Sequence, residues 1–151
     1  MKQIFIVAIS AAFLMSCKND SKQSEVENTL DTEQVQVETA SSDAIQLNNG
    51  EKWAVNEEMK PYVMRSEELV ALYVKNNDTD YKKLAQELKD QNNLLIKSCT
   101  MDGASHDELH KWLHPHLEMV SMLAEVETPE KVKELISEIE GSFIKYHTYF
   151  N

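Results

Sequence analysis

The sequence predicts an all-α protein, an antiparallel four-helix bundle preceded by a lipoprotein signal peptide and a disordered tether. Apolar residues recur at steps of three and four in four successive segments between about residues 51 and 151. The chain of 151 residues also contains only three Gly and three Pro, too few for the many tight turns of a β-sandwich or barrel. Four amphipathic helices joined by short loops favour up-down-up-down order.

Residues 1–16 have the pattern of a secretory signal peptide. Lys2 makes the start positive, and residues 4–15 are almost wholly apolar. A helix over that apolar stretch spans about 18 Å, well short of the bilayer core. We therefore expect the segment to direct export and to be removed, not to cross the membrane.

The signal segment ends in Leu14-Met15-Ser16-Cys17, which resembles the lipobox of bacterial lipoproteins. The resemblance implies cleavage before Cys17, a diacylglyceryl thioether on its sulfur and an acylated amino group. Two or more acyl chains anchor a protein stably to a membrane. Lys18, rather than Asp, follows the cysteine. By the same resemblance this implies the outer membrane, at its periplasmic face or at the cell surface.

Residues 17–48 are expected to form a disordered tether. After the cysteine, the segment consists mainly of Ser, Thr, Gln, Asn, Glu and Asp with scattered Val. Such a composition cannot bury enough apolar surface to offset the entropy of ordering the chain. A short extended piece at residues 44–47 is expected to close the tether, before a turn at Asn48-Asn49-Gly50. The folded domain is expected over residues 49–151.

The first helix is expected over residues 57–75, with Asn56 as its N-cap, and the second over residues 79–98, capped by Asp78 or Thr79. Each has an apolar stripe that predicts its buried face. The stripes are Met59, Tyr62, Val63, Leu69, Val70 and Tyr73 in the first helix, and Tyr81, Leu84, Ala85, Leu88, Leu95 and Ile96 in the second.

The third helix is expected to begin at Ser105, because Glu108 follows it at capping-box spacing. Pro115 lies inside this helix and predicts a kink. The fourth helix is expected to begin at Thr128 as N-cap, with Pro129 at the first helical position. The apolar stripe of the third helix is Leu109, Trp112, Leu113, Leu117, Val120 and Leu123. That of the fourth is Val132, Leu135, Ile136, Ile139, Phe143 and Tyr146.

The up-down order predicts which segments meet. The starts of the first and third helices, the loop between the second and third, and the end of the fourth all lie at one end of such a bundle. Side chains that bind metals are found in these segments, namely Cys99, Met101, His106, His110 and His147. The sequence therefore predicts a metal site at this end of the bundle.

The residue types indicate which metal. With Cys17 lipidated, Cys99 has no partner for an intrachain disulfide, and an unused thiol is a liability in an oxidising envelope. His106 and His110 are four residues apart, so both rings project from the same face of one helix turn. Thiolate, thioether and imidazole together suit copper first and zinc second. In the alternative interpretation, Cys99 is buried as a small hydrophobic residue and no metal binds.

The remaining histidines differ in how well their positions suit binding at the predicted metal site. His147 lies near the end of the fourth helix, at the appropriate end of the bundle, and is the preferred additional ligand. His114 continues the four-residue spacing but lies one turn further on, so it is a weaker candidate. His116 points elsewhere on the helical wheel.

Charge and motifs exclude other classes of function. A net charge of −11 repels phosphate backbones, so we expect no nucleic-acid partner. His106 and His110 have the spacing of a zinc-protease helix, but Asp rather than Glu follows the first His and no third ligand is placed downstream. We therefore expect no enzymatic activity. The least favoured alternative is a non-covalent haem between Met59 and His147, whose placement resembles soluble four-helix b-type cytochromes.

The motif NGEKW at residues 49–53, followed by CxMxGxxHxxLH at residues 99–110, resembles small envelope lipoproteins of Bacteroidetes. The resemblance covers about residues 45–120 and implies heavy-metal handling in the envelope. These features predict a membrane-anchored protein that binds or buffers a soft transition metal, with an envelope metal-handling protein as partner. The alternative is a metal-free, acidic helical module that docks another protein.

Overall fold

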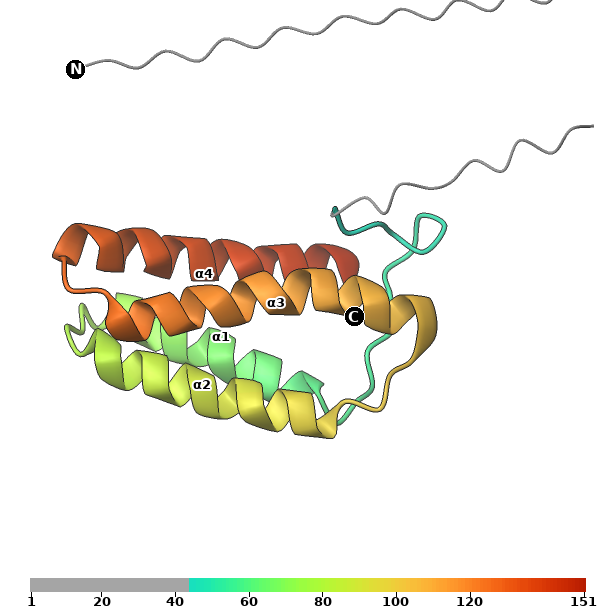
Figure 1. The fold of residues 1–151 in the computed structure, drawn as a ribbon, viewed down its shortest axis with the longest axis horizontal. Coiled ribbons are helices and arrows are strands. Elements are labelled where there is room, and N and C mark those ends of the chain that lie inside the picture. Colours follow the sequence, from blue (N-terminus) through green and yellow to red (C-terminus); the bar gives the residue numbers. More distant parts are fainter. Residues whose placement is uncertain (1–43) are drawn as a thin grey trace, which may run out of the picture. The chain divides into compact units, whose positions relative to one another are not determined.

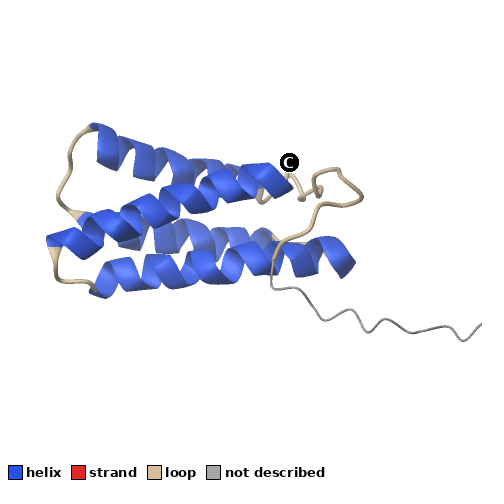
Figure 2. Ribbon diagram, turned by 90° about the horizontal axis from the view of Figure 1, so that it is seen from above, coloured by secondary structure: helices blue, strands red, loops and turns tan. Residues whose placement is uncertain are grey.

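Four helices form the folded part of the chain in the computed structural model, which describes residues 44–151. The predicted signal peptide, Cys17 and most of the predicted tether lie outside the described residues. The helices are α1 (Lys60–Lys75), α2 (Tyr81–Ser98), α3 (Gly103–Glu125) and α4 (Pro129–Tyr149). They lie side by side as a bundle (Figure 1, Figure 2). The prediction of an all-α four-helix bundle is confirmed.

Consecutive helices pack most extensively, α1 on α2, α2 on α3 and α3 on α4, while α1 and α4 contact each other less. This is the packing of an up-down-up-down bundle. Within residues 44–151, no helix combines the length and the apolar character that a membrane span requires.

The core is close to the one that the apolar stripes predict. All six predicted residues of α4 are buried. In α2 the prediction of Ile96 is wrong, because its side chain is 46% exposed, while Asn92 is only 3% exposed. Leu95 occupies the inward position, and the next residue is rotated about 100° around the helix, out of the stripe.

The predicted start of the first helix is wrong by three residues. Met59, not Asn56, is the N-cap of α1. The side chain of Asn56 is engaged elsewhere: its Nδ2 donates to the carbonyl of Ser98 at 2.9 Å, and its Oδ1 accepts from the backbone N–H of Thr100 at 3.3 Å. Asn56 therefore joins the chain before α1 to the loop after α2, a contact that a local capping rule cannot anticipate.

The predicted cap of the second helix is also wrong. Asp80 is the N-cap of α2, and its Oδ1 accepts from the backbone N–H of Lys83 at 3.0 Å. Asp78 instead accepts from the backbone N–H groups of Thr79 and Asp80, at 2.7 and 3.0 Å. It shapes the turn that leads into the helix.

The capping box predicted for the third helix does not form. Asp102 is the N-cap of α3, which begins at Gly103. The hydroxyl of Ser105 donates to the carbonyl of Asp102 at 3.1 Å, and the helix runs on through Pro115 to Glu125. The start of the fourth helix is confirmed, with Thr128 as N-cap and Pro at the first turn.

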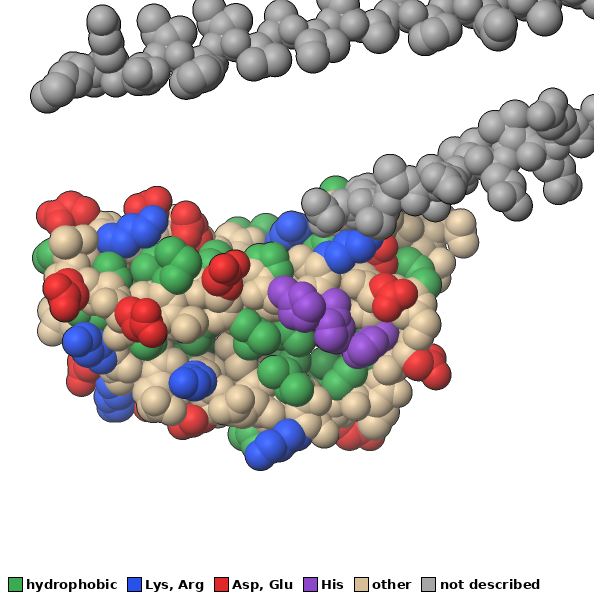
Figure 3. Space-filling view, in the orientation of Figure 1, with side chains coloured by type: hydrophobic (Ala, Val, Ile, Leu, Met, Phe, Trp, Pro, Cys, Tyr) green, Lys and Arg blue, Asp and Glu red, His purple; other side chains and the backbone are tan. Residues whose placement is uncertain are grey.

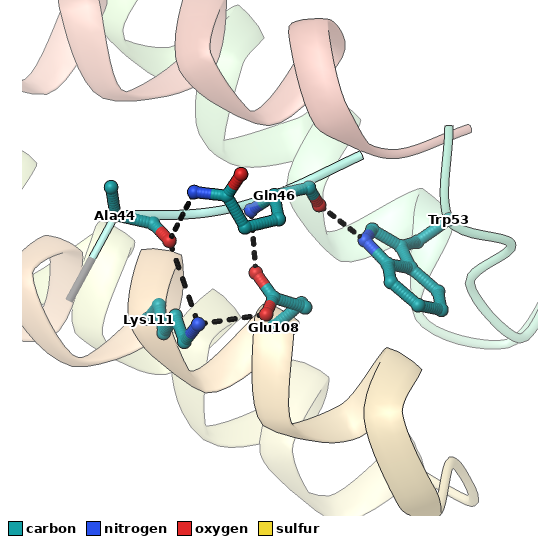
Figure 4. A network of polar contacts seen from close by, with 5 residues as sticks. All are labelled: Ala44, Gln46, Trp53, Glu108 and Lys111. Atoms are coloured by element: carbon teal, nitrogen blue, oxygen red, sulfur yellow. Dashed lines mark hydrogen bonds and ion pairs between the residues drawn. The ribbon is translucent and has the colours of Figure 1, made fainter. Parts of the chain in front are cut away.

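Residues 44–55 form a strap that holds the N-terminal end of α3 (Figure 4). Glu108 accepts from the backbone N–H of Gln46 at 2.7 Å and also pairs with Lys111 at 2.7 Å. The indole N–H of Trp53 donates to the carbonyl of Gln46 at 2.6 Å. Ile45 is 3% exposed and belongs to the core, so the packed part of the chain begins before the predicted boundary at residue 49.

The end of the chain returns to this strap. The backbone N–H of Trp53 donates to Tyr149 at 2.8 Å, and that of Asn151 donates to Trp53 at 3.1 Å. Phe150 is 1% exposed. The end of α4 therefore meets the chain before α1, as the predicted up-down order requires.

Candidate metal-binding site

Three histidines on α3 form a continuous row, which we call the histidine row: His106, His110 and His114. Nε2 of His110 lies 3.0 Å from Nε2 of His106, and Nδ1 of His110 lies 3.0 Å from Nε2 of His114. Figure 3 shows histidine side chains lying next to one another over α3, beside a patch of apolar side chains. The row follows directly from the four-residue spacing, which places successive rings on one side of the helix.

The row lies on the side of α3 that faces away from α4. On the opposite side, Lys111, Pro115 and Met119 line a shallow groove between α3 and α4. At about 100° per residue, the middle of the row lies about 140° around the helix from the middle of these three residues. The row is therefore turned toward the side on which α2 packs.

The outermost histidine of the row is more exposed than the other two. His106 and His110 are half-buried, and His114 is exposed. Glu108, with its contact to the strap, and Lys111 lie in the same turns as the first two histidines and tie this stretch of α3 to the strap. The backbone beneath the row is thus held on both sides, by the core and by the strap.

The electrostatic surroundings favour the uncharged form of the central ring. Burial lowers the pKa of His110, and the neighbouring His106 and His114 lower it further, while Asp107 acts in the opposite direction. An uncharged imidazole carries one N–H and one lone pair. Each 3.0 Å contact is then an N–H that donates to the lone pair of the next ring, with the direction set by the tautomers.

The nitrogen separations are suitable for holding one ion. An imidazole nitrogen lies about 2.0–2.1 Å from a bound Zn²⁺, so two such nitrogens are about 2.8–3.4 Å apart at angles of roughly 90–110°. The observed 3.0 Å falls within this range. To bind an ion, both rings must aim their lone pairs at a point beside the line that joins the nitrogens.

Cys99 and Met101 lie between α2 and α3. Both side chains are partly buried and pack against the hydrophobic core. Among residues 44–151, no three His, Cys, Asp or Glu side chains are grouped so that they could hold a metal ion. The structure therefore brings pairs of histidines together, and a site built around the Cys99 thiolate stays a prediction.

The predicted ligand His147 has another partner. Its Nε2 lies 2.9 Å from Oε2 of Glu67 on α1, and both side chains are about half exposed. This contact lies between α4 and α1, whereas the histidine row lies on the α2 side of α3. Since the two groups lie on different sides of the bundle, the structure does not bring His147 together with His106 and His110. Met59, the other haem ligand of the least favoured alternative, is a core residue at 1% exposure.

Two features of the histidines go beyond the sequence analysis. His114, the weaker candidate, completes the row. His116 is fully buried, whereas the helical wheel indicated only that it points away from the site.

A search of protein-family models, curated proteins and solved structures finds no match to this chain.

Proposed function

We propose that this chain is a lipid-anchored envelope protein that binds a divalent transition-metal ion through the imidazoles of His106 and His110. The observation that carries the proposal is the 3.0 Å separation of their Nε2 atoms on a half-buried helix face. Imidazole suits copper, zinc and nickel, and among divalent ions copper binds most tightly. Copper is therefore the favoured ion and zinc the second.

This proposal implies a different oxidation state of copper from a site built on the Cys99 thiolate. A thiolate selects Cu(I), whereas a pair of imidazoles suits divalent ions. Two protein ligands also leave coordination positions open to water or to ligands of another protein. Such a site is suited to buffering and exchange with an envelope metal-handling partner, not to permanent retention of the ion.

Metal binding is tested on the full chain, purified in detergent and stripped with a chelator. Equilibrium dialysis against Zn(II) and Cu(II) measures the bound ion. His106→Ala/His110→Ala is expected to weaken binding at least about tenfold, since loss of even an outer-shell partner commonly has that effect. Lowering the pH from 7.5 to 5.5 should also weaken binding, because protons compete for the imidazoles.

Two single variants are matched controls. His147→Ala removes an exposed histidine from another side of the bundle and should leave binding unchanged. Cys99→Ser should also leave Zn(II) binding unchanged; a large loss there would restore the thiolate site. Unchanged binding in the double-histidine variant would overturn the proposal and favour the metal-free interaction module.

The anchor is tested separately. Cys17→Ser removes the acyl chains, which are the hydrophobic attachment that the lipobox implies. The variant protein should move from the membrane fraction to the soluble fraction when cells are lysed and centrifuged. Unchanged membrane retention would contradict the lipid anchor and leave the metal site to be judged by dialysis alone.

A further inference from the structure

We infer that the histidine row is two overlapping metal sites that share His110 and hold one ion at a time. The inference rests on the proposed function and extends it to His114. The inner pair is His106 with His110, and the outer pair is His110 with His114. The nitrogen atoms are 3.0 Å apart in both pairs, so both separations are suitable for chelating a metal ion.

The two pairs use different nitrogens of the shared ring. His110 faces His106 through Nε2 and faces His114 through Nδ1. A neutral imidazole has a lone pair on only one nitrogen, because the other carries the proton. An ion in the inner pair therefore requires the proton on Nδ1 of His110, and an ion in the outer pair requires it on Nε2. Occupation of one pair excludes occupation of the other.

The histidine left out of each pair has a positioning role. With the ion in the inner pair, the Nδ1–H of His110 donates to Nε2 of His114. With the ion in the outer pair, the Nε2–H of His110 donates to Nε2 of His106. Hydrogen bonds of this kind to the second nitrogen of a metal-bound histidine fix its tautomer and raise its basicity. Each end of the row thus supports binding at the other end.

The gradient of exposure gives the two positions different roles. His114 is exposed, while His106 and His110 are half-buried. The outer pair is therefore the point at which an ion enters from solution or from a partner, and the inner pair is the more protected position. A change of tautomer at His110 accompanies movement of the ion between them.

Ni(II) titration of the full chain tests this arrangement, since Ni(II) binds imidazole and does not oxidise Cys99. The wild-type chain should bind one ion. His106→Ala and His114→Ala each leave one pair, so each should weaken binding by only about twofold if the pairs are equal, and somewhat more as the supporting hydrogen bond is lost. His110→Ala removes both pairs and should weaken binding much more than either. Helical circular dichroism confirms that each variant is folded.

A second measurement identifies the nitrogen that binds. In the Zn(II) complex, ¹⁵N chemical shifts should show His110 bound through Nε2 in His114→Ala and through Nδ1 in His106→Ala. Two ions per wild-type chain would overturn the inference. The inference would also be overturned if His106→Ala weakened binding as much as His110→Ala while His114→Ala had no effect. That result would leave the proposed function intact. Absence of any metal binding by the wild-type chain would overturn the proposed function itself.

Discussion

Nδ1 of His116 lies 3.0 Å from the hydroxyl of Ser142, across the buried interface of α3 and α4. The imidazole is fully buried and stacks on Trp112, with ring centroids 5.1 Å apart, while Phe143 meets it edge-on. Its Nε2 has no hydrogen-bond partner among the described residues. Burial lowers the pKa of His116 to about 4 from its ordinary value of 6.5, so the ring is neutral in the folded protein at pH 7.

This burial makes stability depend on pH. Between pH 6.5 and 4 the unfolded chain binds a proton at His116 and the folded chain does not, so the free energy of unfolding falls as the pH is lowered. The loss should be about 2 kcal/mol at pH 5 and about 3 kcal/mol once both states are protonated. Urea unfolding of chelator-treated protein at pH 7 and pH 5 measures it.

The control for that experiment is His116→Leu/Ser142→Ala, which replaces both hydrogen-bonding partners by apolar groups. Such paired replacement avoids an unsatisfied buried hydroxyl. The variant should lose most of the difference between pH 7 and pH 5, while the contribution of the carboxylates remains. An unchanged difference would show that other groups cause the pH dependence.

Asp80→Ala should lower the free energy of unfolding by about 1 kcal/mol, because it removes the hydrogen bond to the N–H of Lys83 at the start of α2. Asp102→Ala is the matched control. Asp102 is also an N-cap, but its side chain makes no capping hydrogen bond. Both substitutions remove a negative charge from a helix start, so the difference between their unfolding midpoints in urea measures the hydrogen bond. Equal losses would contradict it.

Glu108→Ala should loosen the strap. It removes the acceptor of the Gln46 N–H and the partner of Lys111. Amide hydrogen exchange at Gln46 is expected to become faster, since its backbone N–H would lose the Glu108 carboxylate as hydrogen-bond acceptor. Glu118→Ala, an exposed glutamate on the same helix, should leave the rate unchanged. Equal exchange at Gln46 in both variants would mean that the contact with Glu108 does not hold the strap.

Leu88→Ala should destabilise the bundle by about 2–5 kcal/mol, the range for a large buried residue whose loss leaves a cavity. Leu88 on α2 is 0% exposed. Leu94→Ala on the same helix is the control, since that side chain is 41% exposed and should contribute less than about 1 kcal/mol. Thermal or urea unfolding distinguishes the two, and similar losses would contradict the described register of α2.

The pattern of apolar residues was enough to predict the helices, because the period of a helix and the need to bury one face act along a single stretch of chain. All six residues predicted for the core side of α4 are buried. Thr128 caps α4 as predicted, since Pro at the first helical position limits where that helix can begin. The other three helix starts were wrong. Asn56 bridges to the loop after α2, and Glu108 binds the strap. Asp80, not Asp78 or Thr79, caps α2.

The histidine row could be predicted from the sequence, because residues four apart on a helix lie on the same side. The sequence could not decide what surrounds that side. His147 has the residue type and the chain position of a ligand, yet it pairs with Glu67 across α1 and α4. Cys99 packs against the core, and His116 is buried beside Trp112. Local spacing determines which side chains share a helix face, whereas the packing of one helix on another decides which faces meet water, the core or another helix.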